Sequence, residues 1–289
     1  MNRKRFLLSA IGLLLAVVCR PKKKTNSKEV EMNTNKMPVL FVGHGSPMNA
    51  VESNSFTKTW NELGKSIPKP KAIVCISAHW LTEGTYVTAM DKPKTIHDFY
   101  GFPKQLMEYL YEAPGDPSLA KKITEDISNP KLSLDKDWGL DHGTWSVLCH
   151  IYPEKNIPVL QLSIDATKDL AWHLEFTKQL SYLRREEVLI IGSGNLVHNL
   201  GLYNWKNPTE ILPWAKEAND TFKKWITEND TKAFVDSDRF TRAMYTAIPT
   251  AEHYIPAIYA LGLREPDDKL EFFNDVLTSS ISMTGFRLG

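Results

Sequence analysis

Residues 39–47 read VLFVGHGSP, an apolar run followed by a glycine-rich turn. Four consecutive apolar residues are typical of a short strand covered on both faces, because a half-buried strand alternates apolar and polar side chains. The run ends in a glycine, a histidine and a second glycine, and glycine lets the backbone turn sharply and approach a ligand closely. We therefore predict a buried strand that presents His44 at its carboxyl end.

Three further apolar runs resemble the first, at residues 72–76, 159–162 and 188–191. Segments with apolar residues at helical spacing lie between and after them. These segments are residues 56–63, 105–111, 119–127, 170–183 and 214–226. Alternating strands and helices are typical of α/β proteins. We predict a single layered α/β domain whose central sheet is mostly parallel and is flanked by helices.

Histidines follow two of the other apolar runs as well. His79 comes shortly after residues 72–76, and His198 follows residues 188–191 after a GSGN turn. Ligands of open α/β sheets bind outside the carboxyl ends of the strands. We therefore expect His44, His79 and His198 to meet in one cleft and to form a metal site there. Imidazole suits both zinc and iron, so the residue type does not choose the metal.

Three more histidines stand among aromatic residues, glycines or prolines. They are His97 in TIHDFYGFP (95–103), His142 in WGLDHGTW (138–145) and His253 in PTAEHYIP (249–256). Apolar walls around a few polar groups are typical of a small-molecule pocket. His150 and His173 have no comparable surroundings, and we expect structural or surface roles for them.

The motifs of several other classes are missing from the sequence. It has no Cys-x-x-Cys pair and no His-Glu-x-x-His, which excludes zinc fingers and zincins. The order Gly-x-Ser-x-Gly is absent at residues 43–47, and Val197 replaces the third glycine of a dinucleotide fingerprint. Three cysteines cannot build a disulfide framework. We expect Cys75 and Cys149 to be buried thiols.

The net charge of +1 combines a basic start with an acidic body. Residues 1–36 contain nine basic and two acidic side chains, which leaves 26 basic and 32 acidic ones for residues 37–289. An acidic body without a cluster of Lys and Arg argues against nucleic acid as a partner. The basic segment is therefore a tail or a targeting signal rather than part of the fold.

Residues 1–19 resemble a signal or anchoring segment. Basic residues at 3–5 precede an apolar stretch at 6–18, which is short for a membrane span. A twin-arginine signal, a lipoprotein signal ending at Cys19 and a plain secretory peptide are the alternatives. The basic linker at 20–36 begins with charges that oppose translocation. We predict an exported or membrane-anchored protein with possible membrane association through residues 1–19, and a cytoplasmic protein as the alternative.

The motifs taken together resemble those of the class III extradiol ring-cleavage dioxygenases, and most closely their 4,5-DOPA extradiol dioxygenase branch. The stretches that carry the resemblance are GHGSPMN (43–49), SAHW (77–80), TIHDFYGFP (95–103), WGLDHGTW (138–145), QLSID (161–165), GNLVHN (194–199) and EHYIP (252–256). They run through essentially all of residues 37–289. The resemblance implies that this region is one catalytic dioxygenase domain.

The same resemblance implies the site residues. It makes His44, His79 and His253 metal ligands, and it matches His198 to a fourth metal-site histidine that is either a ligand or a base. Related enzymes bind iron through two histidines and one carboxylate, so Glu252 is a rival ligand.

A second set of residues is implied for proton transfer and substrate binding. His142 matches a pocket histidine that handles protons, which makes it, with His198, a candidate catalytic residue. His97, Trp80 and Trp145 are candidate substrate-binding residues. Phe99 and Tyr100 are further candidates for the wall of the ring pocket.

The activity implied is cleavage of a catechol ring, such as that of L-DOPA, with O₂. Fe(II) is the expected metal for activity, and Zn(II) is the expected metal in purified protein. Zinc has no redox chemistry, so a zinc-loaded protein should bind a catechol without cleaving it. A zinc hydrolase on the same histidines and a catalytically silent metal- or catechol-binding protein are the alternatives. The physiological catechol and the oligomeric state stay open.

Overall fold

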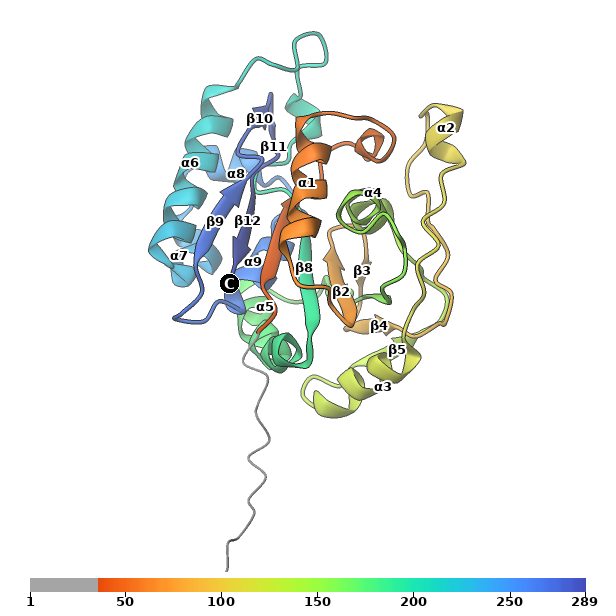
Figure 1. Cartoon of the computed structure of the whole chain (residues 1–289). Helices are drawn as coiled ribbons and strands as arrows, with labels where there is room; N and C mark the ends of the chain where they lie inside the picture. The colour runs from red at the N-terminus through yellow and green to blue at the C-terminus, as the bar shows by residue number, and fades with distance from the viewer. Residues whose placement is uncertain (1–35) are drawn as a thin grey trace, which may run out of the picture. The chain divides into compact units, whose positions relative to one another are not determined.

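The computed structural model describes residues 36–289, and a six-stranded sheet lies at the centre of this part of the chain (Figure 1). The strand order is β6-β2-β8-β1-β12-β9. The strands are β1 (Val39–Gly43), β2 (Ala72–Ser77), β6 (Val159–Gln161), β8 (Val188–Gly194), β9 (Leu270–Phe273) and β12 (Gly285–Leu288). The first four pair in parallel, and β12 runs antiparallel between β1 and β9. The predicted α/β fold with a mostly parallel sheet is confirmed.

The parallel block consists of the four apolar runs found in the sequence. Every residue of β1, β2, β6 and β8 is buried. Side chains of β1 alternate between two cores, with Phe41 in one and Leu40 in the other. Burial on both faces is the reason why these strands have no polar alternation.

Helices cover both faces of the sheet. They are α1 (Ser55–Ser66), α2 (Lys104–Met107), α3 (Pro117–Asp126), α4 (His142–Ile151), α5 (Leu170–Thr177), α6 (Pro213–Glu228), α7 (Thr231–Val235), α8 (Arg242–Ala247) and α9 (Ile255–Gly262). Buried residues of α1 and α4 belong to the core that contains Leu40, whereas those of α5 to α9 belong to the core that contains Phe41. Figure 1 shows α1 in front of the sheet and α9 behind it.

Some elements differ from the predictions. The helix predicted over 170–183 is divided into α5 and a 3-10 segment at Lys178–Glu186, and the helix predicted over 105–111 ends at Met107. Helix α4 was not predicted, because nine of its ten residues are buried and it has no polar face to create a periodicity. Short strands outside the main sheet were also not predicted. They are β3 (Leu81–Thr82), β4 (Tyr86–Thr88), β5 (Ser133–Asp135), β7 (Ile164–Asp165), β10 (Leu277–Thr278) and β11 (Ile281–Ser282).

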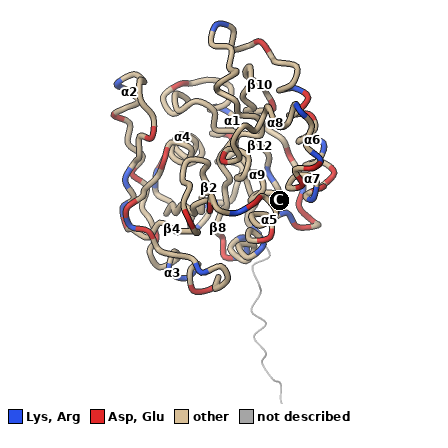
Figure 2. The backbone as a smooth tube through the Cα atoms, turned by 180° about the vertical axis from the view of Figure 1, so that it is seen from behind, with Lys and Arg blue, Asp and Glu red and all other residues tan. Residues whose placement is uncertain are grey.

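The charges of the described residues are distributed over the surface. Lys and Arg are interspersed with Asp and Glu along α6 and α7 (Figure 2). Cys75 and Cys149 are buried and unpaired, as expected.

The prediction of an exported or membrane-anchored protein is corrected. Among residues 36–289, no helix has the length and apolar character that crossing a membrane requires. Residues 1–19, on which the prediction rested, lie outside the described residues. Their apolar stretch at 6–18 is also shorter than the roughly 20 residues of a membrane-spanning helix. The division of the chain at residues 19 and 36 stays a prediction.

A buried ion pair connects the first described residues to the end of the chain. Arg184 and Asp268 are fully buried and form two hydrogen bonds, of 2.7 and 2.8 Å. Arg184 also donates to the carbonyl oxygens of Met37 and Leu263. Although burial opposes it, the hydrogen bonds from Arg184 lower the pKa of Asp268 to about 2.

We predict that Asp268→Asn lowers the free energy of unfolding by about 3 kcal/mol, because it leaves a buried guanidinium without its charged partner. Urea unfolding followed by circular dichroism measures this. In the wild type, the contribution is complete above pH 3.8 and is lost as the pH falls towards 2, since the folded pKa is below the ordinary value. The matched control is Asp267→Asn, which removes a 76% exposed partner of Lys36 and should cost much less, because solvent screens exposed ion pairs. Equal losses in the two variants would contradict the prediction.

Candidate metal centre

Five histidines meet at the carboxyl ends of the parallel strands. His44 follows β1, His79 follows β2 and His198 follows β8, as predicted. His142 is the first residue of α4, and His253 lies two residues before α9.

The five rings form one cluster. The ring of His44 has its centroid 5.0 Å from that of His79, 5.5 Å from that of His142 and 5.3 Å from that of His253. The rings of His198 and His253 are stacked, with centroids 3.6 Å apart.

The ligand atoms form two groups within this cluster. One group comprises His44, His79 and His142, and the other comprises His198, Glu252 and His253. In each group, one nitrogen or oxygen of every residue lies within 4.8 Å of the others. The Nε2 atoms of His44 and His79 are only 3.2 Å apart. The centroids of His79 and His253, which are 5.0 Å apart, connect the two groups.

Glycines allow the elements that carry these histidines to approach closely. A Cβ on Gly194, at the end of β8, would lie 2.2 Å from the carbonyl oxygen of His253. Because Gly194 has no Cβ, the carbonyl of His253 can approach β8 and accept a hydrogen bond from the backbone N–H of Asn195. A Cβ on Gly143 would lie 2.5 Å from Ser77 Oγ and 3.0 Å from the ring of His79. Larger residues at either position would therefore push the histidines apart.

Helix α4 begins at the cluster because Asp141 caps it. The Asp141 carboxylate accepts from the backbone of Thr144 at 3.2 Å, from Ser77 Oγ at 2.7 Å and from Gln161 Nε2 at 2.7 Å. Asp141 is completely buried, and burial raises its pKa. Its hydrogen bonds fix the direction in which His142 enters the cluster.

The Nδ1 atoms of three of these histidines contact carboxylate oxygens. His142 donates from Nδ1 to Asp98 Oδ2 at 2.9 Å and from its backbone N to Asp98 Oδ1 at 3.0 Å. The same Oδ2 lies 3.3 Å from His79 Nδ1. His253 donates from Nδ1 to Glu252 at 3.1 Å. Although burial opposes it, the hydrogen bond from His142 lowers the pKa of Asp98. Asp98 is therefore an ionised acceptor at neutral pH.

Four of the histidines, His44, His79, His198 and His253, are neutral at physiological pH. Burial, and then the other imidazoles, lower the pKa values of His44 and His253 well below the ordinary value. The same causes lower the pKa of His79 to about 3, and burial lowers the pKa of His198 to about 4. A neutral imidazole with Nδ1 protonated keeps a lone pair on Nε2, and that form binds metals. The donor set therefore fits a divalent zinc or iron ion.

The other predicted site residues lie at different distances from the cluster. The Phe99 ring contacts that of His142, with centroids 5.5 Å apart, whereas Tyr100 is 93% exposed. Trp80 is buried and stacks on Trp138. His97 and Trp145 pack against each other at 5.5 Å. The structure thus brings Phe99 to the histidines, and the substrate-binding roles of His97, Trp80 and Trp145 stay predictions.

The two histidines for which we expected no metal role lie elsewhere. His150 Nε2 bonds the carbonyl oxygen of Asn49 at 2.7 Å, and buried His173 bonds the Tyr259 hydroxyl. Two residues of the site were not predicted, namely Asp98 and Ser193. Both lie inside stretches singled out in the sequence, TIHDFYGFP and GSGN, but only the histidine or glycines of those stretches were weighed.

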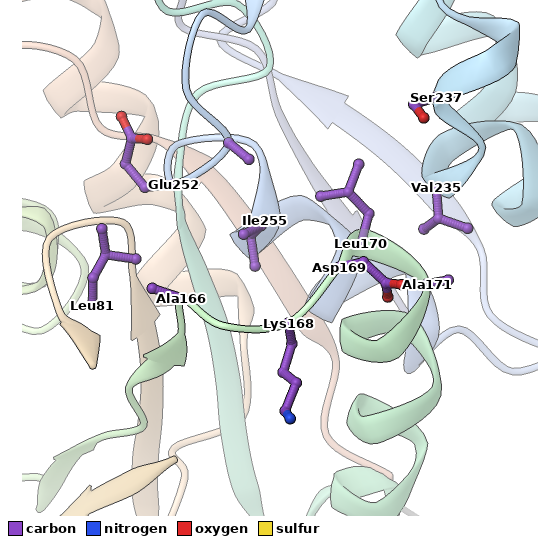
Figure 3. A pocket seen from close by; sticks show the side chains of 11 residues that line it. Leu81, Ala166, Lys168, Asp169, Leu170, Ala171, Val235, Ser237, Glu252 and Ile255 are labelled. Atoms are coloured by element: carbon purple, nitrogen blue, oxygen red, sulfur yellow. The ribbon is translucent and has the colours of Figure 1, made fainter. Parts of the chain in front are cut away.

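A pocket of about 470 Å³ adjoins the cluster through Glu252. Leu81 and Glu252 lie on one side of it, and Val235 and Ser237 lie on the other (Figure 3). Lys168 is the single cation among its lining residues. The volume is in the range of small-molecule sites.

The family described as "Catalytic LigB subunit of aromatic ring-opening dioxygenase" matches residues 37–285. The chain belongs to this family. It is a ring-cleavage dioxygenase and therefore an oxidoreductase, and the resemblance to class III extradiol dioxygenases is confirmed. Residues 1–36 lie outside the match.

Named relatives match most of the chain. The chain is 41% identical over 270 residues to the Escherichia coli (strain K12) protein "4,5-DOPA dioxygenase extradiol", covering 91% of this chain and 98% of that protein. It is 34% identical over 260 residues to the Beta vulgaris protein of the same name, covering 87% and 96%. The crystal structure of an uncharacterized Escherichia coli K12 protein superposes with a TM-score of 0.75 at 37% identity, covering 88% of this chain and 100% of that one.

Proposed function

We propose that the protein is a metal-dependent extradiol dioxygenase that cleaves the ring of an L-DOPA-like catechol with O₂. The observation that carries this proposal is the cluster of five imidazoles at the carboxyl ends of the strands, of which His44, His142 and His253 are buried. The names of the relatives support the substrate class. The family consists of dioxygenases, so the zinc hydrolase alternative is dropped. The other alternative, a catalytically silent metal- or catechol-binding protein, is tested by turnover.

His44, His79 and His253 are the proposed metal ligands, each through Nε2, and His198 is a fourth histidine that faces the same metal. Glu252 supports His253, since its Oε1 accepts from both His253 Nδ1 and the Thr250 hydroxyl. Fe(II), when bound, supplies open positions that bring the catechol hydroxyls and O₂ to one centre.

His142 is the proposed base. Asp98 holds its Nδ1 proton, so Nε2 is the nitrogen that accepts a proton from a catechol hydroxyl. The Asp98 carboxylate then stabilises the imidazolium, and His142 returns the proton as the ring opens. Phe99 packs edge-on against His142 and keeps water from one side of the base.

We predict that a divalent metal stabilises the chelator-treated full-length protein. Zinc at about 100 times its Kd adds about 2.7 kcal/mol and should raise Tm by about 5–10 °C in a thermal scan. His253→Ala should lose this shift, because it removes a ligand. His150→Gln is the matched control, since His150 lies outside the cluster, and it should keep the shift. An equal shift in both variants would place the metal elsewhere.

Turnover tests the proposed reaction. Fe(II)-loaded protein given L-DOPA should consume O₂, measured with an electrode, and form a yellow ring-opened product. His142→Ala should retain iron and lose kcat by about 10²-fold or more, because proton transfer lacks its base. His44→Ala should lose iron and activity together. The zinc-loaded protein should bind L-DOPA without turnover. No O₂ uptake with any catechol at confirmed iron occupancy would refute the proposal.

We place the substituent of the catechol in the pocket beside Glu252, with its carboxylate towards Lys168. The other charged groups there are engaged, since Asp169 caps α5 and Glu252 holds His253. Lys168→Met should raise the KM for L-DOPA by about 2–5-fold, the range of an exposed ion pair. The KM values for dopamine and catechol, which have no carboxylate, should not change. A uniform change for all three substrates would contradict this placement.

A further inference from the structure

Ser193 lies under the metal cluster and contacts His44. It belongs to β8 and is paired in register with Val42 of β1, two residues before His44. Both Ser193 and His44 are buried, with exposed fractions of 0% and 1%. Ser193 Oγ lies 3.0 Å from His44 Nδ1. His44 is the histidine whose ring adjoins those of His79, His142 and His253.

The direction of the hydrogen bond between Ser193 and His44 is determined by a third group. Ser193 Oγ donates to the carbonyl oxygen of Gly143 at 2.5 Å. A hydroxyl has one proton to donate, and this carbonyl can only accept. Ser193 must therefore accept from His44, which requires that Nδ1 of His44 carries the proton. Nε2 of His44 is left with a free lone pair.

The neighbouring histidine points to the same arrangement. His79 Nδ1 lies 3.3 Å from an Asp98 carboxylate oxygen, which only accepts, so His79 is also protonated on Nδ1. The two Nε2 atoms, 3.2 Å apart, then face each other with lone pairs and cannot form a hydrogen bond. Two nitrogens that would both bind one tetrahedral zinc ion at about 2.1 Å are roughly 3.4 Å apart, close to the observed separation. The contact is thus repulsive unless a cation lies between the two atoms.

We propose that Ser193 is a positioning residue that fixes His44 in its Nδ1-protonated tautomer and so aims Nε2 at the metal. This rests on the proposed metal site of His44, His79 and His253. Ser193 also joins the three elements that build the site, since it belongs to β8, contacts the end of β1 and holds the first turn of α4 through Gly143. A residue that orients a ligating histidine in this way contributes about 10–100-fold to metal affinity.

Ser193→Ala tests the proposal in the full-length protein. Long-range ¹H–¹⁵N NMR of ¹⁵N-histidine protein reports which nitrogen of His44 is protonated, and the spectrum of His44→Gln assigns the signal. Chelator-treated wild type should show Nδ1 protonated, whereas Ser193→Ala should show both tautomers. The Kd for zinc, measured by competition with a chromogenic chelator, should rise by about 10–100-fold in the variant.

Two matched variants separate positioning from packing. Ser146→Ala removes an equally buried hydroxyl, on α4, that has no hydrogen-bond partner among residues 36–289, and it should leave the tautomer and zinc Kd unchanged. Ser193→Thr keeps the hydroxyl and should restore both readouts, which also covers the case that Ser193→Ala fails to fold. A wild-type tautomer and a Kd within twofold of Ser146→Ala, or a threonine variant that folds but has lost the tautomer, would overturn the proposal.

Failure of the proposed function has a different signature. Wild type that binds zinc and shows the Nδ1-protonated His44, but consumes no O₂ with iron and a catechol, would refute ring cleavage of catechols and leave the role of Ser193 intact. The tautomer in chelator-treated protein depends on neither metal nor substrate.

Discussion

The pairing of β1 with β8 is the constraint on which the rest of the site depends. The two strands run in parallel with Gly43 opposite Gly194, and the backbone of His44 donates to the Gly194 carbonyl at 3.1 Å. Their carboxyl ends therefore lie at one edge, with β2 beside them. The absence of a Cβ at Gly194 then lets the segment before α9 approach, and it brings His253 to the same edge.

The charge of the imidazoles determines what the carboxyl ends of the parallel strands can bind. Five imidazoles that were all protonated could not share one buried site, and burial with mutual repulsion keeps His44, His79, His198 and His253 neutral. Two carboxylates, those of Asp98 and Glu252, contact Nδ1 atoms of the histidines. The Nε2 lone pairs of His44, His79 and His253 are therefore free to bind a metal, because hydrogen-bond acceptors contact the Nδ1 atoms on the opposite side of these rings.

The parallel block and the meeting of three histidines could be predicted, because continuous apolar runs identify strands buried on both faces and their carboxyl ends share an edge. Helix α4 could not, since a helix buried all round has no periodicity. The strands β9 and β12 were also not predicted, because each has only four residues and is too short to show a periodicity. Nothing in sequence spacing places Ser193 beside His44, or Asp98 beside both His79 and His142, because those contacts depend on strand register and on a loop. The sequence alone leaves open whether Glu252 binds the metal or orients a histidine that does. Its contact with Nδ1 of His253 favours the orienting role.

In the proposed site, histidine nitrogens rather than the buried thiols hold the metal. Burial raises the pKa values of the Cys75 and Cys149 thiols, so neither of these two cysteines of residues 36–289 is a thiolate at neutral pH. X-ray absorption at the zinc edge of the zinc-loaded, full-length protein tests this most directly. The spectrum should show nitrogen and oxygen ligands with the scattering of at least three imidazoles. A spectrum with sulfur ligands, or with oxygen ligands and no imidazole, would show that the metal is not held by this histidine cluster.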